Sequence, residues 1–239
     1  MTWSIVAHDP TTGAVAVAVT TCAFAVGASC PFVRSGVGAV STQSMTNRYL
    51  GPAVLDGMAR GLSPAAAIEG ALAGDEGKGL RQVHAVDRHG RSAAYTGRHC
   101  VEWCGEITGN DVSLAGNMLA GPAVLADTYA AFVASDGLPL PERLLAALDA
   151  GEAAGGDRRG RQSAALVLAT TEDFPDLSLR VDDHPQPLTE LRRLHRVWLA
   201  QRAPFLAEQP RKARPSGNTD LDVVEARWAQ AGLDLKFRR

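Results

Sequence analysis

The sequence has few aromatic residues and little net charge. Phe, Trp and Tyr make up only 5% of its 239 residues, while Ala, Val, Leu and Gly fill most apolar positions. A core of small side chains favours closely packed layers. The net charge is −2, with acids and bases intermixed. We therefore expect neither nucleic acid nor an anionic membrane surface as a partner.

Long apolar runs and paired cysteines are also missing. No run of 18 apolar residues occurs, and no basic segment followed by an apolar one opens the chain. We therefore expect a cytoplasmic protein. Its four cysteines, at 22, 30, 100 and 104, form no Cys-x-x-Cys pair. A chain of this length can bury a core without disulfides, so reduced thiols are expected.

Two short sequence patterns resemble binding sites, one for zinc and one for a dinucleotide, but each lacks a part that such a site needs. His99, Cys100 and Cys104 lie near Glu102 and Glu106, and on a strand residues 100, 102, 104 and 106 would share a face. A structural zinc site needs a second compact ligand pair, which this cluster lacks. Residues 36–38 lack the third glycine of a dinucleotide site. We expect neither a metal nor a cofactor.

Strands and helices alternate in groups along the chain. The sequence predicts an opening hairpin at 2–8 and 13–21, and helices at 51–60, 63–73, 122–135, 139–153 and 188–200. Further strands are predicted at 38–43, 81–86, 92–96, 101–107, 112–118, 163–169 and 177–182. This grouping favours an α+β fold, a four-layer αββα sandwich of two antiparallel sheets between helical layers.

The domain is expected to span 1–202. After it the composition shifts to prolines and basic residues, which predicts a linker at 203–219 and a short helix at 220–234 within the 203–239 extension.

Thr2 opens the first strand. If Met1 is removed, Thr2 carries a free α-amino group and a hydroxyl, a nucleophile with its own base. The alternative is that Thr2 only begins a strand.

Three further polar blocks stand where strands meet turns. Asn117 ends a strand and could donate to an oxyanion, or it could be a turn residue. Asp182, Asp183 and His184 could orient a base, or simply lead into a helix. The third block runs from 155 to 163, and its candidate substrate-binding residues are Asp157, Arg158, Arg159, Arg161 and Gln162.

That third block could bind an anionic substrate group. Glycines let the backbone approach a ligand, and guanidinium groups bind carboxylates or phosphates. We expect Asp157 to hold one arginine, and Arg161, which precedes a buried strand, to point inward. A solvated turn with surface ion pairs is the alternative.

Together these blocks resemble one bacterial family, known as domain of unknown function 1028. It is placed in the N-terminal nucleophile (Ntn) hydrolase superfamily. The resemblance covers about 2–200 and rests on four segments in order: 2–9, 116–121, 155–165 and 180–185. It implies an αββα sandwich, Thr2 as the nucleophile of an amidohydrolase, and a homodimer.

One departure affects the implied mechanism. Proteasome-type relatives keep an acid after the second strand and a Lys at the start of the third. Here no acid follows Thr21, and Arg34, which we also count as a candidate substrate-binding residue, is the cation available near the third strand. Two alternatives therefore stay open: a non-catalytic small-molecule binding or assembly protein on the same scaffold, and Cys22 or Cys30 as an internal nucleophile.

Overall fold

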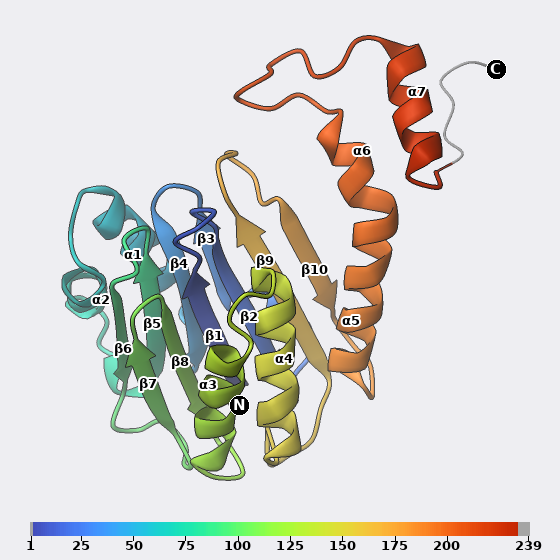
Figure 1. Cartoon of the computed structure of the whole chain (residues 1–239). Helices are drawn as coiled ribbons and strands as arrows, with labels where there is room; N and C mark the ends of the chain where they lie inside the picture. The colour runs from blue at the N-terminus through green and yellow to red at the C-terminus, as the bar shows by residue number, and fades with distance from the viewer. Residues whose placement is uncertain (1, 234–239) are drawn as a thin grey trace. The chain divides into compact units, whose positions relative to one another are not determined.

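Two antiparallel sheets form the centre of the protein. The computed structural model describes residues 2–233. Within them one sheet has six strands and the other four (Figure 1). The six-stranded sheet has the order β10 (Leu177–Val181), β9 (Ser163–Ala169), β2 (Val15–Thr21), β1 (Thr2–His8), β8 (Val112–Asn117) and β7 (Gly105–Gly109). The four-stranded sheet has the order β3 (Pro31–Arg34), β4 (Gly38–Ser44), β5 (Arg81–Asp87) and β6 (Ser92–Thr96).

Helix pairs cover the outer faces of both sheets. Helices α1 (Leu50–Ala59) and α2 (Pro64–Leu72) pack on the four-stranded sheet. Helices α3 (Ala123–Ala134) and α4 (Leu140–Ala153) pack on the six-stranded sheet. The arrangement confirms the predicted αββα sandwich. Short 3₁₀ turns lie at Val26–Ala28 and Lys78–Leu80.

The central strands are buried on both faces, as their sequences require. Every residue of β1, β2 and β9 is buried. Between the sheets, Val6, Val15 and Val17 pack against Ala39 and Val86 of the four-stranded sheet. Small side chains on both sides allow this close packing, as the scarcity of aromatic residues predicts.

One predicted strand is wrong in its first half. The prediction of 101–107 fails because 101–104 crosses from β6 in one sheet to β7 in the other. In this crossing the carbonyls of Val101 and Trp103 accept hydrogen bonds from the N–H groups of Met118 and Leu119, at 2.8 and 2.9 Å. Residues 100, 102, 104 and 106 therefore share no strand face. The short strand β3 was not predicted.

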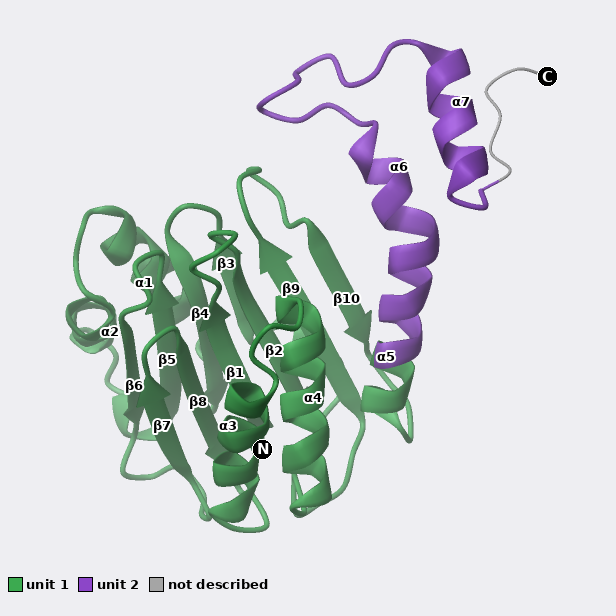
Figure 2. Cartoon of the chain, viewed as in Figure 1, with its two compact units in different colours: residues 1–191 green, residues 192–239 purple. Residues whose placement is uncertain are grey.

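The chain divides into two compact units, residues 1–191 and 192–239 (Figure 2). Helix α5 (Pro187–Val197) runs across this division in sequence, and Trp198–Arg202, α6 (Ala203–Ala207) and α7 (Leu221–Gln230) follow it. Helix α6 falls inside the segment predicted as a linker. Residue 234, the predicted end of the last helix, and Met1 lie outside the described residues. No helix in 2–233 is long and apolar enough to cross a membrane.

Candidate functional site

The polar ends of four adjacent strands meet at one edge of the six-stranded sheet. Thr2, at the start of β1, pairs with Asn117 at the end of β8. Thr21, at the end of β2, pairs with Ser163 at the start of β9. The β1–β2 register places Trp3 opposite Thr20, so Thr2 and Thr21 are neighbours. Antiparallel pairing thus gathers segments that are far apart in the sequence.

Thr2 lies at the centre of this edge and is 6% exposed. Its hydroxyl donates to the hydroxyl of Thr21 at 3.2 Å. Its carbonyl accepts from the side-chain amides of Gln43, at 3.3 Å, and Asn117, at 3.5 Å. The backbone of Thr2 is therefore held from both sheets.

A chain of buried amides extends from Thr2 to the edge of the second sheet. Gln82 is fully buried, and its Oε1 accepts from both Gln43 and Asn117 at 2.9 Å. Its Nε2 donates to the Thr96 hydroxyl at 3.0 Å and to the Gly116 carbonyl at 2.8 Å. Since the Asn117 amide already donates to Gln82 and Thr2, the geometry supports positioning of Thr2 as its role rather than donation to an oxyanion.

A buried histidine continues the polar network between the sheets. The hydroxyl of Ser4 lies 2.6 Å from Gln43 Oε1, 2.7 Å from His84 Nε2 and 3.0 Å from the Ser41 hydroxyl. His84 Nδ1 lies 3.2 Å from the Ser113 hydroxyl. Burial lowers the pKa of His84 to about 3, so the ring is neutral at physiological pH.

Asp157 joins the 155–162 loop to the same edge. Its side chain is fully buried and accepts from the Cys22 N–H at 2.8 Å, directly after β2. It also accepts from the backbone N–H of Arg159 at 2.9 Å and from the Arg159 guanidinium at 3.1 Å. The loop is fixed further by an N–H···O bond from Ala120 to Gly156 at 3.0 Å. Asp157 holds one of the three arginines, as expected.

The other predicted residues of this loop are placed differently. Arg161 is 43% exposed, forms an ion pair with Glu152 and donates to Gln186 at 2.7 Å, so it does not point inward as expected. Arg158 is exposed, and its side chain has no hydrogen bond or ion pair among residues 2–233. The Gln162 N–H donates to the Thr21 carbonyl at 2.9 Å, which keeps Gln162 beside the site.

Arg34 does not join this group. It pairs with Gly38 at the far end of β4, whereas Gln43, near the other end of that strand, contacts Thr2. Its guanidinium instead forms an exposed ion pair with Asp56 at 2.9 Å. Strand direction thus separates this cation from Thr2.

The cysteines show no sign of an activated thiol or a metal site. All four are free thiols. Burial raises the pKa of Cys30 to about 11, whereas a nucleophilic cysteine needs a lowered pKa. Cys22 is half-buried, and its backbone N–H donates to Asp157, while no histidine contacts its thiol among the described residues. Among the described residues, no group of three or more His, Cys, Asp or Glu side chains is placed to hold a metal ion.

Strained backbone gathers near the same edge. Across 2–233, four residues other than glycine have positive φ. Three of them follow or end strands there: Ala25 (φ 55°), Ser44 (φ 71°) and Met118 (φ 54°). Such conformations cost energy and cluster at functional sites. The backbone conformation therefore points to this edge as a candidate functional site, and this evidence is independent of the side chains.

Gln82 and His84 were missed by the sequence analysis. A signal existed, because both polar residues alternate with Val83 and Ala85 on a strand whose other face is apolar. Alternation of this kind usually means that the polar face meets solvent. Here it meets the other sheet instead.

The chain is similar to known proteins in both sequence and structure. The model of a family described as "Family of unknown function (DUF1028)" matches residues 2–191. The chain belongs to the DUF1028 family. A crystal structure of a Silicibacter pomeroyi protein matched by the same family model is similar to it, with 33% identity and a TM-score of 0.85, over 90% of this chain and 94% of that one.

Other comparisons add little to the DUF1028 assignment. Anbu (ancestral beta-subunit) from Yersinia bercovieri aligns with 9% identity and a TM-score of 0.39, over 87% of this chain and 98% of that one. A likeness of this strength carries no argument about function. No curated protein matches the chain significantly.

Proposed function

We propose that this protein is an Ntn-type amidohydrolase that cleaves an amide or lactam bond of a small anionic substrate. Thr2 would be the nucleophile after removal of Met1. The observation that carries the proposal is the position of Thr2, at the edge where four strand ends and the 155–162 loop meet. The strained backbone around that edge gives independent support.

In the proposed reaction, Thr2 supplies both the nucleophile and the base, and water completes the turnover. The free α-amino group takes the proton of the Thr2 hydroxyl, and the oxygen attacks the substrate carbonyl. The tetrahedral intermediate collapses to an ester as the amine leaves with that proton, and water then hydrolyses the ester. An α-amine has a reference pKa of about 7.7–8.0, so a useful fraction is unprotonated at neutral pH. Backbone N–H groups at the edge would receive the oxyanion.

Asn117 and Asp157 would act as positioning residues. Asn117 and Gln43 bind the Thr2 carbonyl and fix the strand end that carries the nucleophile. Asp157 brings a carboxylate to the Cys22 N–H, the place after β2 where the sequence itself has no acid. Arg159 accompanies it as a cation. The loop thus supplies groups that the strand sequences lack.

Arg158 is the arginine best suited to bind the anionic end of the substrate. Arg159 and Arg161 already contact Asp157 and Glu152, whereas the Arg158 side chain makes no such contact among the described residues. A guanidinium binds a carboxylate in a bidentate geometry. Gln162 lies in the same loop and would supply a further hydrogen bond.

The test begins with intact-mass measurement of protein from its native host. Loss of Met1 is expected. Trimmed protein is then screened against anionic amides and lactams, and Thr2→Ala should abolish hydrolysis while Thr2→Ser keeps part of it. A loss of about 10⁴-fold or more is expected when a nucleophile is removed.

Thr12→Ala is the matched control for this test. Thr12 is exposed, and among the described residues its hydroxyl bonds within the β1–β2 turn alone, to Asp9 at 2.7 Å and Ala14 at 3.3 Å, so its replacement should leave hydrolysis unchanged. Retention of Met1 in the native host would rule out the mechanism. Full activity of trimmed Thr2→Ala protein would do the same.

A second candidate function has its own observation. The hydroxyl and carbonyl of Thr2 are both hydrogen-bonded and nearly buried, which also suits a purely structural residue. The protein would then be a non-catalytic small-molecule binding or assembly protein. In that case trimmed protein binds small anions but cleaves none, and Thr2→Ala changes stability alone.

The assembly and location of the protein remain proposals. We propose a cytoplasmic homodimer whose partner is a small molecule rather than nucleic acid or membrane. Light scattering after size-exclusion chromatography tests the dimer, because a monomeric mass at micromolar concentration contradicts it.

A further inference from the structure

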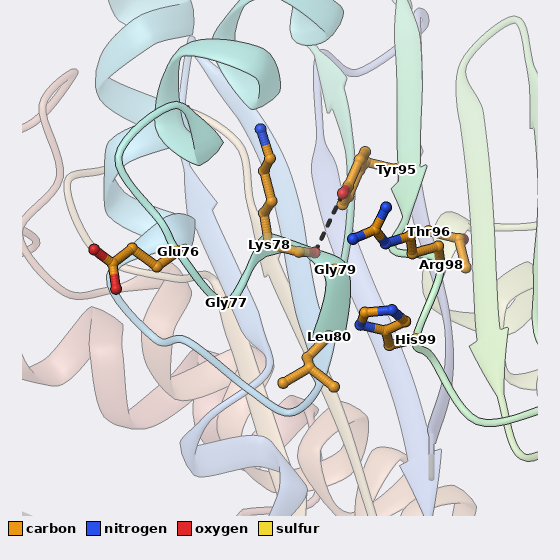
Figure 3. Close-up of a pocket in the computed structure, with 9 residues that line it drawn as sticks. All are labelled: Glu76, Gly77, Lys78, Gly79, Leu80, Tyr95, Thr96, Arg98 and His99. Atoms are coloured by element: carbon orange, nitrogen blue, oxygen red, sulfur yellow. Dashed lines mark hydrogen bonds between the residues drawn. The ribbon is translucent and has the colours of Figure 1, made fainter.

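A cavity with basic residues in its lining lies between β6 and the loop that precedes β5. It has a volume of about 490 Å³, within the usual range for small-molecule sites. Figure 3 shows its lining, which includes Lys78, Tyr95, Thr96, Arg98 and His99. None of these residues belongs to the proposed nucleophile site.

The cavity walls are held by backbone contacts between two loops. The His99 N–H donates to the Gly79 carbonyl at 2.7 Å, and the Gly97 N–H donates to the Arg81 carbonyl at 2.8 Å. The Tyr95 hydroxyl donates to the Lys78 carbonyl at 3.2 Å. At Gly97 a side chain would overlap the Gly79 carbonyl, so the close approach requires glycine. The cavity is therefore preformed.

An ion pair anchors the loop from its other side. Asp75 accepts from Arg81 Nε at 2.9 Å, from Asn47 at 2.8 Å and from the Gly77 N–H at 2.8 Å. The Arg81 hydrogen bond lowers the pKa of Asp75 to about 2. Arg81 and Asp75 thus bind each other and hold the loop in place, whereas Lys78 and Arg98 of the cavity form no such ion pair among the described residues.

The two cations that line the cavity, Lys78 and Arg98, have no anionic partner among the described residues. Lys78, Arg98 and His99 are exposed, and within 2–233 their side chains form no hydrogen bond or ion pair. The one acid of the lining, Glu76, points away from Arg98 and His99 in Figure 3. Elsewhere in the sandwich, Arg91 is paired with Asp87 at 2.6 Å. Positive charge thus remains available in the cavity.

We propose that this cavity binds a small organic oxyanion, a carboxylate or a phosphate monoester. The planar guanidinium of Arg98 would take two oxygens, and Lys78 would add a point charge. Thr96 lines the cavity, and its hydroxyl accepts from Gln82, the amide that also contacts Asn117, and donates to Glu106 at 2.5 Å. A ligand here would therefore touch the network that positions Thr2, but its binding does not depend on hydrolysis.

Calorimetric titration of the full-length protein tests the proposal with three probes. Inorganic phosphate and citrate should bind at millimolar or lower concentration, and glucose should not. A preference between the first two identifies the oxyanion. Arg98→Ala should weaken binding about tenfold or more, because a charge-assisted pair is lost. Lys78→Ala should weaken it less, and Arg98→Lys should be intermediate.

Arg60→Ala is the matched control. Arg60 is an exposed arginine after α1 without a side-chain contact among the described residues, and it lies outside this cavity. Its replacement should leave the affinity unchanged. Equal affinity of Arg98→Ala and the parent, an equal loss in Arg60→Ala, or no binding of either anion would overturn the proposal. Thr2→Ala should bind the probes normally, which separates this test from that of hydrolysis.

Discussion

At the residue scale, the network around Ser4 and His84 places hydrogen-bonded polar groups where a sandwich usually packs apolar ones. A consistent arrangement has the Ser4 hydroxyl donating to Gln43 and the His84 Nε2–H donating to Ser4, while His84 Nδ1 accepts from Ser113. Each buried group is then satisfied. Loss of one partner would cost about 1–3 kcal/mol, so the network also fixes how β1 and β4 pack across the two sheets.

The same histidine predicts how stability depends on pH. The His84 pKa is about 3 in the folded protein against an ordinary 6.5, so between these values the unfolded chain binds a proton that the folded one does not. The free energy of unfolding should therefore fall as pH drops below 6.5, by up to about 1.4 kcal/mol per pH unit from this group. Urea unfolding at pH 4–7 measures the slope.

His84→Gln is the comparison that isolates this effect. It keeps hydrogen-bonding capacity but cannot take up a proton in this range. Its stability should fall less steeply with acid than that of the parent, since the carboxylates titrate alike in both. Parallel curves would show that His84 does not contribute.

At the element scale, α4 reaches the six-stranded sheet through a glycine. A side chain at Gly151 would overlap the Thr128 hydroxyl of α3 and would lie 2.9 Å from Trp3 Nε1. Helices α3 and α4 can therefore close over Trp3, the large buried residue beside Thr2. The Thr128 hydroxyl donates to the Val124 carbonyl at 2.6 Å and is fixed in that position.

This packing predicts opposite effects for two helical glycines. Gly151→Ala should destabilise the protein by about 1–3 kcal/mol, because overpacking outweighs the gain in helix propensity. Gly70→Ala in α2 is the matched control, with nothing within 4 Å of the added carbon, and should stabilise by up to about 1 kcal/mol. Chemical denaturation measures both. A stabilised Gly151→Ala variant would contradict the packing argument.

At the scale of the whole molecule, the 203–239 extension has contacts of its own. Phe205 and Trp228 stack with ring centroids 5.1 Å apart. Glu208 accepts from Arg227 at 3.1 Å and from Asn218 at 2.8 Å. These bonds, the Asn218 bond foremost, lower the Glu208 pKa against the opposing effect of burial. Within the extension, residues 205–208 therefore contact residues 218–228 across the proline-containing segment between them.

We propose that residues 1–202 fold without this extension, as the sequence predicts. The family match ends at 191, and both sheets and the first four helices precede that point. The truncated chain should unfold in one transition, with a midpoint within about 4 °C of the parent, the shift that 1 kcal/mol gives in a domain of this size. Scanning calorimetry measures it. An insoluble or broadly melting product would contradict the proposal.

Much of the fold was predictable because most strands and helices carry a local pattern of their own, although β3 and α6 do not. The Asp9-Pro10 turn, the Ser63 cap with Pro64 and the alternation of β5 all indicate their elements without reference to the rest of the chain. The 101–104 crossing was not predictable, because its alternating pattern resembles a strand while its backbone bonds go to Met118 and Leu119. A sequence pattern shows the spacing of apolar residues, but it does not show which segments form hydrogen bonds with each other.

For the candidate site, the sequence by itself determined which segments are polar at strand ends, and the family resemblance that ties them together. It also determined the closely packed layers, since small apolar residues on both faces of a strand must be covered on both. Only the tertiary structure decided that Asp157 reaches Cys22, that Arg34 lies at the other end of its strand, and that Gln82 and His84 face inward. These facts depend on which strands become neighbours, and strands far apart in the sequence pair in both sheets. No local stretch of sequence encodes that choice of partner.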